Sequence, residues 1–147
     1  MIPVPQTVLV VDDEVEDRQS MRATLRAAGH TVLEASNFHS AVNKFAQHRD
    51  DISLLIADVS LPDVNGCELA RIILQARPDM KVLLVSGQAG AEICRFYGVT
   101  SFTLHLLEKP FKPIELLTRA YRVILSDERI EVSSGGVANP TLKSIAG

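Results

Sequence analysis

The sequence predicts a doubly wound α/β domain, with a five-stranded parallel sheet covered by helices on both faces. Short apolar runs alternate with segments of helical periodicity five times along the chain. Each run is almost entirely apolar, as in strands that right-handed crossovers bury on both faces. The chain has 147 residues, 46% of them apolar and 22% charged. This length and composition fit one folded domain rather than a disordered chain.

The expected strands are apolar runs that stop abruptly at polar residues. The first and third runs end at carboxylates, and the fourth ends at Ser86-Gly87. A fifth run precedes Lys109-Pro110. The predicted strands are residues 7–11, 31–35, 53–57 and 81–85, with the fifth contained in 102–107.

The expected helices carry apolar residues at helical spacing, in residues 15–28, 36–48, 67–76, 89–97 and 113–125. Gly29 closes the first, because glycine commonly ends a helix. Ser36-Asn37 offers N-cap side chains to the second, and Pro113 suits the first turn of the last. The fourth has the weakest pattern.

After Leu125 the periodic pattern gives way to polar and small residues. We therefore expect one domain over residues 1–125, followed by a flexible tail or severed linker over 126–147.

Composition argues against several other classes of protein. A net charge of -3 provides no basic field for phosphate backbones, so direct nucleic-acid binding is not expected. Neither a signal-like N-terminus nor a membrane-length apolar segment occurs, so a cytoplasmic protein is expected. The two cysteines, Cys67 and Cys94, lack metal-ligand spacing, and small buried residues are favoured over a disulfide.

Polar side chains follow four of the predicted strands. These residues are Asp12, Asp13, Asp58, Ser86 and Lys109. In an open α/β sheet, ligands bind beyond the carboxyl ends of strands where the strand order reverses. Three carboxylates gathered there repel one another unless a cation lies among them or their protonation changes. Magnesium, which favours oxygen ligands, is the cation that the sequence indicates.

The same cluster suits phosphoryl chemistry. Lys109 beside a metal matches a dianionic phosphoryl group, and the Ser86 hydroxyl can donate to another phosphoryl oxygen. Asp58 needs no general base, because a carboxylate is already ionised at neutral pH. The sequence therefore predicts formation of an acyl phosphate at Asp58.

Four motifs in chain order resemble those of the response-regulator receiver family of two-component signalling, over residues 7–125. They are Val10-Val11-Asp12-Asp13-Glu14, Asp58-Val59-Ser60-Leu61-Pro62-Asp63-Val64-Asn65-Gly66, Leu84-Val85-Ser86-Gly87 and Leu107-Glu108-Lys109-Pro110-Phe111. The resemblance implies a flavodoxin-like (βα)5 fold with strand order 2-1-3-4-5. It also implies a signalling switch rather than an enzyme.

The resemblance further implies roles for individual residues. Asp58 would accept a phosphoryl group from a histidine kinase or a histidine phosphotransfer protein. Asp13, Asp58 and the main-chain carbonyl of Ser60 would bind Mg²⁺ directly, and Asp12 would help through water.

Two further residues, Ser86 and Lys109, would contact the oxygens of the phosphoryl group. The resemblance also implies a cis peptide bond between Lys109 and Pro110. Phosphorylation would change partner binding, and the resemblance leaves room for a homodimer through the fourth-helix and fifth-strand region.

The sequence also departs from its family. Leu106 stands where the family usually has an aromatic residue, three positions before the lysine. The stretch 86–98 is shorter than usual and 98–109 is longer, so the fourth helix should be short or displaced. We expect the backbone of residues 87–105 to carry the response to phosphorylation.

Rival classes fit less well. A flavodoxin-like electron carrier needs a phosphate-binding loop after its first strand, where Asp12-Asp13-Glu14 would repel the phosphate. A phosphatase with an aspartyl nucleophile has alternating rather than adjacent acids there. An unphosphorylated interaction module and a phosphate sink in a phosphorelay stay open as alternatives.

Overall fold

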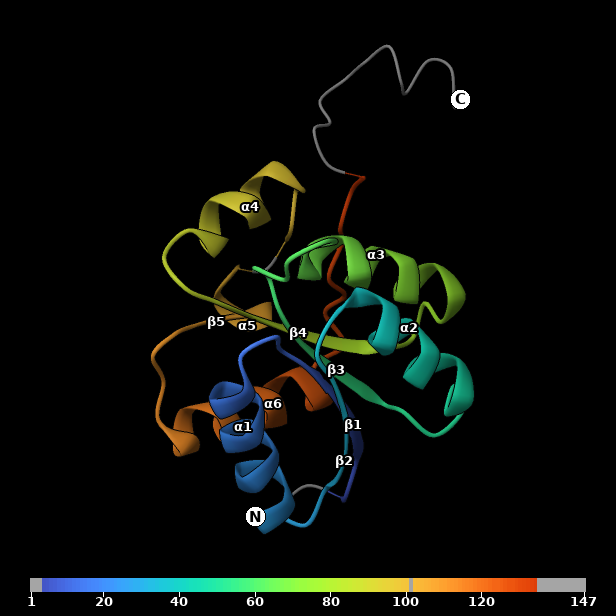
Figure 1. The fold of residues 1–147 in the computed structure, drawn as a ribbon, viewed down its shortest axis with the longest axis vertical. Helices are drawn as coiled ribbons and strands as arrows, with labels where there is room; N and C mark the ends of the chain where they lie inside the picture. The colour runs from blue at the N-terminus through green and yellow to red at the C-terminus, as the bar shows by residue number, and fades with distance from the viewer. Residues whose placement is uncertain (1–3, 101, 135–147) are drawn as a thin grey trace.

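A computed structural model describes residues 4–100 and 102–134, which form a five-stranded parallel sheet between two layers of helices (Figure 1). The strand order is β2-β1-β3-β4-β5. This arrangement confirms the predicted fold class and strand order. In chain order the elements are β1 (Thr7–Val11), α1 (Val15–Ala27), β2 (Thr31–Ala35), α2 (Phe38–Gln47), β3 (Leu54–Asp58), α3 (Gly66–Ala76), β4 (Lys81–Ser86), α4 (Gly90–Phe96), α5 (Phe102–His105), β5 (Leu106–Glu108) and α6 (Pro113–Leu125).

The sheet separates two apolar cores because neighbouring side chains on a strand point to opposite faces. On β1, Val8 and Val10 share one core with residues of α1 and α6, while Leu9 and Val11 share the other with α2, α3 and α4. Figure 1 shows α1 and α6 together on one side of the sheet and α2 and α3 on the other. Burial on both faces explains why the central strands β1, β3 and β4 are mainly apolar, whereas the edge strand β2 includes Glu34.

The helix ends follow the signals in the sequence. The Asn37 side chain caps α2 by accepting a hydrogen bond from the Ser40 backbone N–H at 2.8 Å. Gly29 follows α1 with a φ of 96°, a conformation that glycine adopts without strain. Within the described residues, no helix combines the length and the apolar character needed to cross a membrane.

The region expected to contain the fifth strand holds a short helix as well. Residues 102–105 form α5, and the strand is the three-residue β5 that follows. Leu104 of α5 is buried in the core that α6 shares. A run this short has no periodicity that separates helix from strand. The insertion accounts for the long spacing before Lys109, and α4, with seven residues, is short as expected.

Residues 126–134, which we call the C-terminal strap, pack against the domain. Ile130 is buried in the core with α2 and α3. The backbone N–H of Ser133 donates to the Tyr97 carbonyl at 2.8 Å, and the Thr100 N–H donates to the Glu131 carbonyl at 3.3 Å. This packing differs from the expected flexible tail, because Ile130 and Val132 supply apolar side chains that cover the core. Residues 135–147 of that expected tail lie outside the described residues.

We predict that Ile130→Ala lowers the free energy of unfolding by about 2–4 kcal/mol, since it removes buried methyl groups and leaves a cavity. Leu125→Ala is the matched control, because Leu125 is 61% exposed whereas Ile130 is 7% exposed. Urea denaturation of both variants measures the difference. Equal losses would contradict the structural role of the strap.

Candidate functional site

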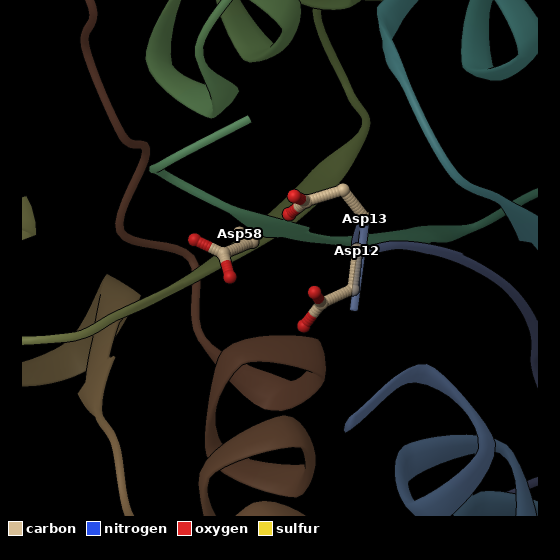
Figure 2. A group of neighbouring side chains, drawn as sticks. All are labelled: Asp12, Asp13 and Asp58. Atoms are coloured by element: carbon tan, nitrogen blue, oxygen red, sulfur yellow. The ribbon is translucent and has the colours of Figure 1, made fainter. Parts of the chain in front are cut away.

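Three carboxylates meet at the carboxyl ends of β1 and β3. Asp12 and Asp13 follow β1 directly, and Asp58 is the last residue of the neighbouring β3. One oxygen from each of the three carboxylates lies within 4.8 Å of the others. Figure 2 shows the three side chains turned toward a common space at this edge of the sheet. Asp12 and Asp58 are buried, whereas Asp13 is exposed.

Lys109 brings a cation into this cluster from the end of β5. Its Nζ lies 2.6 Å from Oδ2 of Asp58, 2.9 Å from Oδ2 of Asp12 and 2.9 Å from Oδ2 of Asp17. Burial alone would lower the pKa of Lys109, but hydrogen bonds to these three carboxylates outweigh it and raise that pKa above its usual value. Lys109 is therefore positively charged at neutral pH.

Asp17 is a residue that sequence reasoning missed. It lies in the first turn of α1, where an acid is ordinary because it complements the positive end of the helix dipole. Its contact with Lys109 joins residues 92 positions apart. Nothing in the local pattern distinguishes it from the other acid in that turn, Glu16.

Burial also changes the titration of Asp12. Loss of solvation raises the pKa of Asp12, although hydrogen bonds from Lys109 and from the Glu14 backbone N–H act in the opposite direction. Burial, rather than repulsion from Asp58, is therefore the main reason for the raised pKa of Asp12. Three carboxylates and one ammonium group meet at this edge of the sheet, so a further cation would be favourable there.

Backbone donors orient two of the carboxylates. The Glu14 N–H donates to Oδ1 of Asp12 at 2.9 Å, and the Ser60 N–H donates to Oδ1 of Asp58 at 2.7 Å. Each bond runs from a backbone N–H two residues later, a local arrangement typical of aspartate in loops. Ser60 thus lies in the loop beside the acceptor candidate, with its side chain exposed.

Ser86 ends β4, the strand next to Asp58. The residue is fully buried, and its hydroxyl has no hydrogen-bond partner among the residues that the structure describes. Its carbonyl accepts the Lys109 backbone N–H at 2.7 Å, which joins the two chain segments. A buried hydroxyl without a partner is costly. The geometry therefore leaves the Ser86 hydroxyl available to a bound group.

Two glycines let helices approach the site closely. A Cβ on Gly66, the first residue of α3, would lie 2.3 Å from the Asp58 carbonyl oxygen. A Cβ on Gly90, the first residue of α4, would lie 2.2 Å from the Ser86 Cβ. Only glycine fits either position without a shift of its neighbours. The beginnings of α3 and α4 therefore rest directly on the backbone of Asp58 and on the side chain of Ser86.

The structure brings the predicted site residues together. Asp12, Asp13, Asp58 and Lys109 form one cluster, and Ser86 lies at the end of the adjacent strand. The peptide bond between Lys109 and Pro110 is cis, as the family resemblance implied. The cluster combines oxygen ligands for a hard cation, a fixed ammonium group and an available hydroxyl.

Comparisons with known proteins agree with this geometry. A family model for the response regulator receiver domain matches residues 8–121. The phosphate regulon transcriptional regulatory protein PhoB of Pseudomonas aeruginosa is 30% identical over 140 residues, which cover 91% of this chain and 60% of PhoB. The chain thus spans less than two thirds of this relative.

Solved structures show the same fold. A response regulator receiver domain protein from Clostridium thermocellum aligns with a TM-score of 0.72 at 24% identity, over 81% of this chain and 94% of that one. A chain of the CheX–CheY complex with BeF3 and Mg²⁺ from Borrelia burgdorferi aligns with a TM-score of 0.70 at 21% identity, over 84% and 92%. Because the family model covers most of the chain, this protein belongs to the response regulator receiver domain family of two-component systems.

Proposed function

We propose that this receiver domain accepts a phosphoryl group on Asp58 from a histidine kinase or a histidine phosphotransfer protein, and that phosphorylation changes which partner it binds. The observation that carries the proposal is the position of Asp58. Its carboxylate lies among Asp12, Asp13 and Lys109 at the carboxyl edge of the sheet. Such a cluster can neutralise and orient a phosphoryl group beside an ionised nucleophile.

Magnesium would be held by Asp13, Asp58 and the main-chain carbonyl of Ser60, with Asp12 acting through water. The donor set fits, because it consists of oxygen atoms and its three carboxylates outnumber the single Lys109 ammonium group. The neighbouring structure described with BeF3 and Mg²⁺ supports this choice of ion. When bound, Mg²⁺ would neutralise charge on the phosphoryl oxygens.

The protein's own side chains would carry out the transfer. A carboxylate oxygen of Asp58 forms a bond to phosphorus while the bond from phosphorus to the histidine nitrogen of the donor breaks. Lys109 then pairs with the new phosphoryl oxygens in place of Oδ2 of Asp58, and the Ser86 hydroxyl donates to another of them. The result is a phosphorylated signalling module that does not itself turn over a substrate.

Labelling with acetyl phosphate tests this function. Intact mass spectrometry should show one added phosphoryl group in the presence of Mg²⁺ and none when a chelator removes the metal. Acetyl phosphate avoids the need for the natural kinase. Labelling that is independent of Mg²⁺ would contradict the proposed metal role.

We predict that Asp13→Ala weakens Mg²⁺ binding at least about tenfold, whereas Ser86→Ala changes it little. Only the first substitution removes a proposed metal ligand, and the Asp13 side chain is exposed, so the fold should tolerate its loss. A metal titration followed by fluorescence or calorimetry measures both constants. Similar losses in the two variants would mean that this division of roles is wrong.

The output of the switch is proposed to involve residues 87–105 and a homodimer through α4 and β5. Leu106, in place of the family's aromatic residue, is buried in the core with α2 and α3. It has no ring or hydroxyl that could change position as the Ser86 side chain moves. We therefore place the response in the backbone that includes α4, whose first residue contacts Ser86.

A further inference from the structure

The two cysteines of the chain, far apart in sequence, touch in the folded domain. Cys67 lies in the first turn of α3 and Cys94 lies on α4, and both are fully buried. Their sulfur atoms are 3.8 Å apart, with the Cys67 thiol donating to the Cys94 sulfur. Neither cysteine belongs to the carboxylate cluster or has a role in the proposed phosphoryl transfer. The pair is therefore an unassigned group of two potential nucleophiles.

We propose that Cys67 and Cys94 form a redox-sensitive pair, which a peroxide converts into a disulfide that fastens α4 to α3. The contact already joins the two sulfur atoms without an intervening side chain. A disulfide has a sulfur–sulfur distance of about 2.05 Å, so oxidation requires the sulfurs to approach by about 1.8 Å. The two thiols are free in the structure, which represents the reduced form.

The contact shifts the pKa values of the two thiols in opposite directions. The hydrogen bond raises the pKa of Cys67, and burial raises it further. The same hydrogen bond lowers the pKa of Cys94, with burial opposing and the Arg95 charge assisting. Because the thiolate is the reactive form of cysteine, Cys94 is the sulfur that attacks the oxidant.

The oxidation can be written with hydrogen peroxide as the two-electron oxidant. The Cys94 thiolate attacks one peroxide oxygen, the O–O bond breaks, and the departing hydroxide takes a proton to leave as water. The Cys67 sulfur then attacks the resulting sulfenic acid and forms the disulfide. The second hydroxide takes the Cys67 proton, so two thiols and one peroxide yield one disulfide and two waters.

The structure of α4 allows peroxide to reach Cys94 and allows the two sulfur atoms to approach each other. The helix has seven residues, and its N-cap residue, Ala89, makes no side-chain capping hydrogen bond. Phe96 on the same helix is 59% exposed, so α4 is covered on one side only. Short, weakly capped elements open locally more often than the core does. Such opening admits a molecule as small as peroxide to Cys94.

The disulfide would join the two helices that rest on the site. Gly66 at the start of α3 contacts the Asp58 backbone, and Gly90 at the start of α4 contacts Ser86. If a phosphoryl group moves the Ser86 side chain, α4 must move with it. A disulfide that fastens α4 to α3 would then oppose the movement of α4 on phosphorylation. This consequence rests on the proposed function.

Peroxide titration of the full chain tests the disulfide without any phosphorylation. Intact mass should fall by two hydrogen atoms and return to its starting value with a phosphine reductant, and protease digestion should yield a peptide pair linked through Cys67 and Cys94. Cys94→Ala is the control, in which the loss of two hydrogens should disappear. Glutathione in the same solution serves as a reference thiol that shows when the peroxide has reacted. The proposal is overturned if Cys67 and Cys94 both stay free after the glutathione is fully oxidised. Oxygen adducts without the link, or a disulfide between two chains, would overturn it equally.

Hydrogen exchange with Mg²⁺ and beryllofluoride, a phosphoryl mimic, then tests the consequence. Reduced protein should change its protection over residues 87–105, and oxidised protein should change it less. Equal responses would show that the disulfide does not fasten α4. No response in the reduced protein would contradict the proposed output and its regulation, while the disulfide result would stand.

Discussion

Asp58→Asn is expected to abolish phosphoryl labelling while the domain stays folded. Asparagine has the size of aspartate, and its Oδ1 can still accept the Ser60 N–H that the carboxylate accepts at 2.7 Å. The amide lacks the ionised oxygen that would attack phosphorus. Lys109 keeps Asp12 and Asp17 as partners at 2.9 Å each, so this half-buried cation is not left unpaired.

Intact mass spectrometry after incubation with acetyl phosphate and Mg²⁺ measures the loss, and circular dichroism checks the fold. Asp63→Asn is the matched control, because Asp63 lies exposed in the loop that follows Asp58. That variant should label like the parent. If Asp58→Asn also labels like the parent, Asp58 is not the phosphoryl acceptor.

Gly66→Ala should have the second large effect, since it places a methyl group 2.3 Å from the Asp58 carbonyl oxygen. Alanine normally favours a helix over glycine by about 1 kcal/mol, so propensity alone predicts a gain in stability. Overpacking against backbone costs about 1–3 kcal/mol or more and outweighs that gain. We therefore expect the free energy of unfolding to fall by up to about 2 kcal/mol after both effects.

The same substitution should slow phosphorylation, because the clash with the Asp58 carbonyl can be relieved only if α3 or Asp58 itself moves. A displacement of a reacting group of about 1 Å can reduce a rate by two orders of magnitude, and we expect at least a tenfold decrease in labelling rate. Gly87→Ala is the control, because a Cβ there meets nothing within 4 Å. Urea denaturation should leave that control within about 0.5 kcal/mol of the parent. A stable, normally labelled Gly66→Ala protein would refute the close-packing argument.

The elements most accurately predicted from sequence are those whose signals are local. β1 ends where Asp12 interrupts an apolar run, and α2 begins at a side chain, Asn37, that can cap it. The proximity of Asp12 and Asp58 could also be predicted, because parallel strands bring their carboxyl ends to one edge and the strand order implied by the family resemblance places β3 next to β1.

Features that depend on contacts between distant segments escaped prediction. Asp17 reaches Lys109 only because the first turn of α1 lies beside the segment that follows β5, and Ile130 is buried only because the strap returns across the domain. A composition rich in small polar residues concealed that return. The contact between Cys67 and Cys94 likewise depends on how closely α4 lies to α3. Helical periodicity carries no information on that distance.

The strap has a mechanical consequence. Its last described residues are tied to the end of α4, because the Ser133 N–H and side chain both donate to the Tyr97 carbonyl. The described main chain therefore still contacts the domain beside Tyr97, well beyond Leu125, where α6 ends. A rotation of α4 would displace this contact along with it. Movement of the helix next to Ser86 would thus be transmitted to the strap.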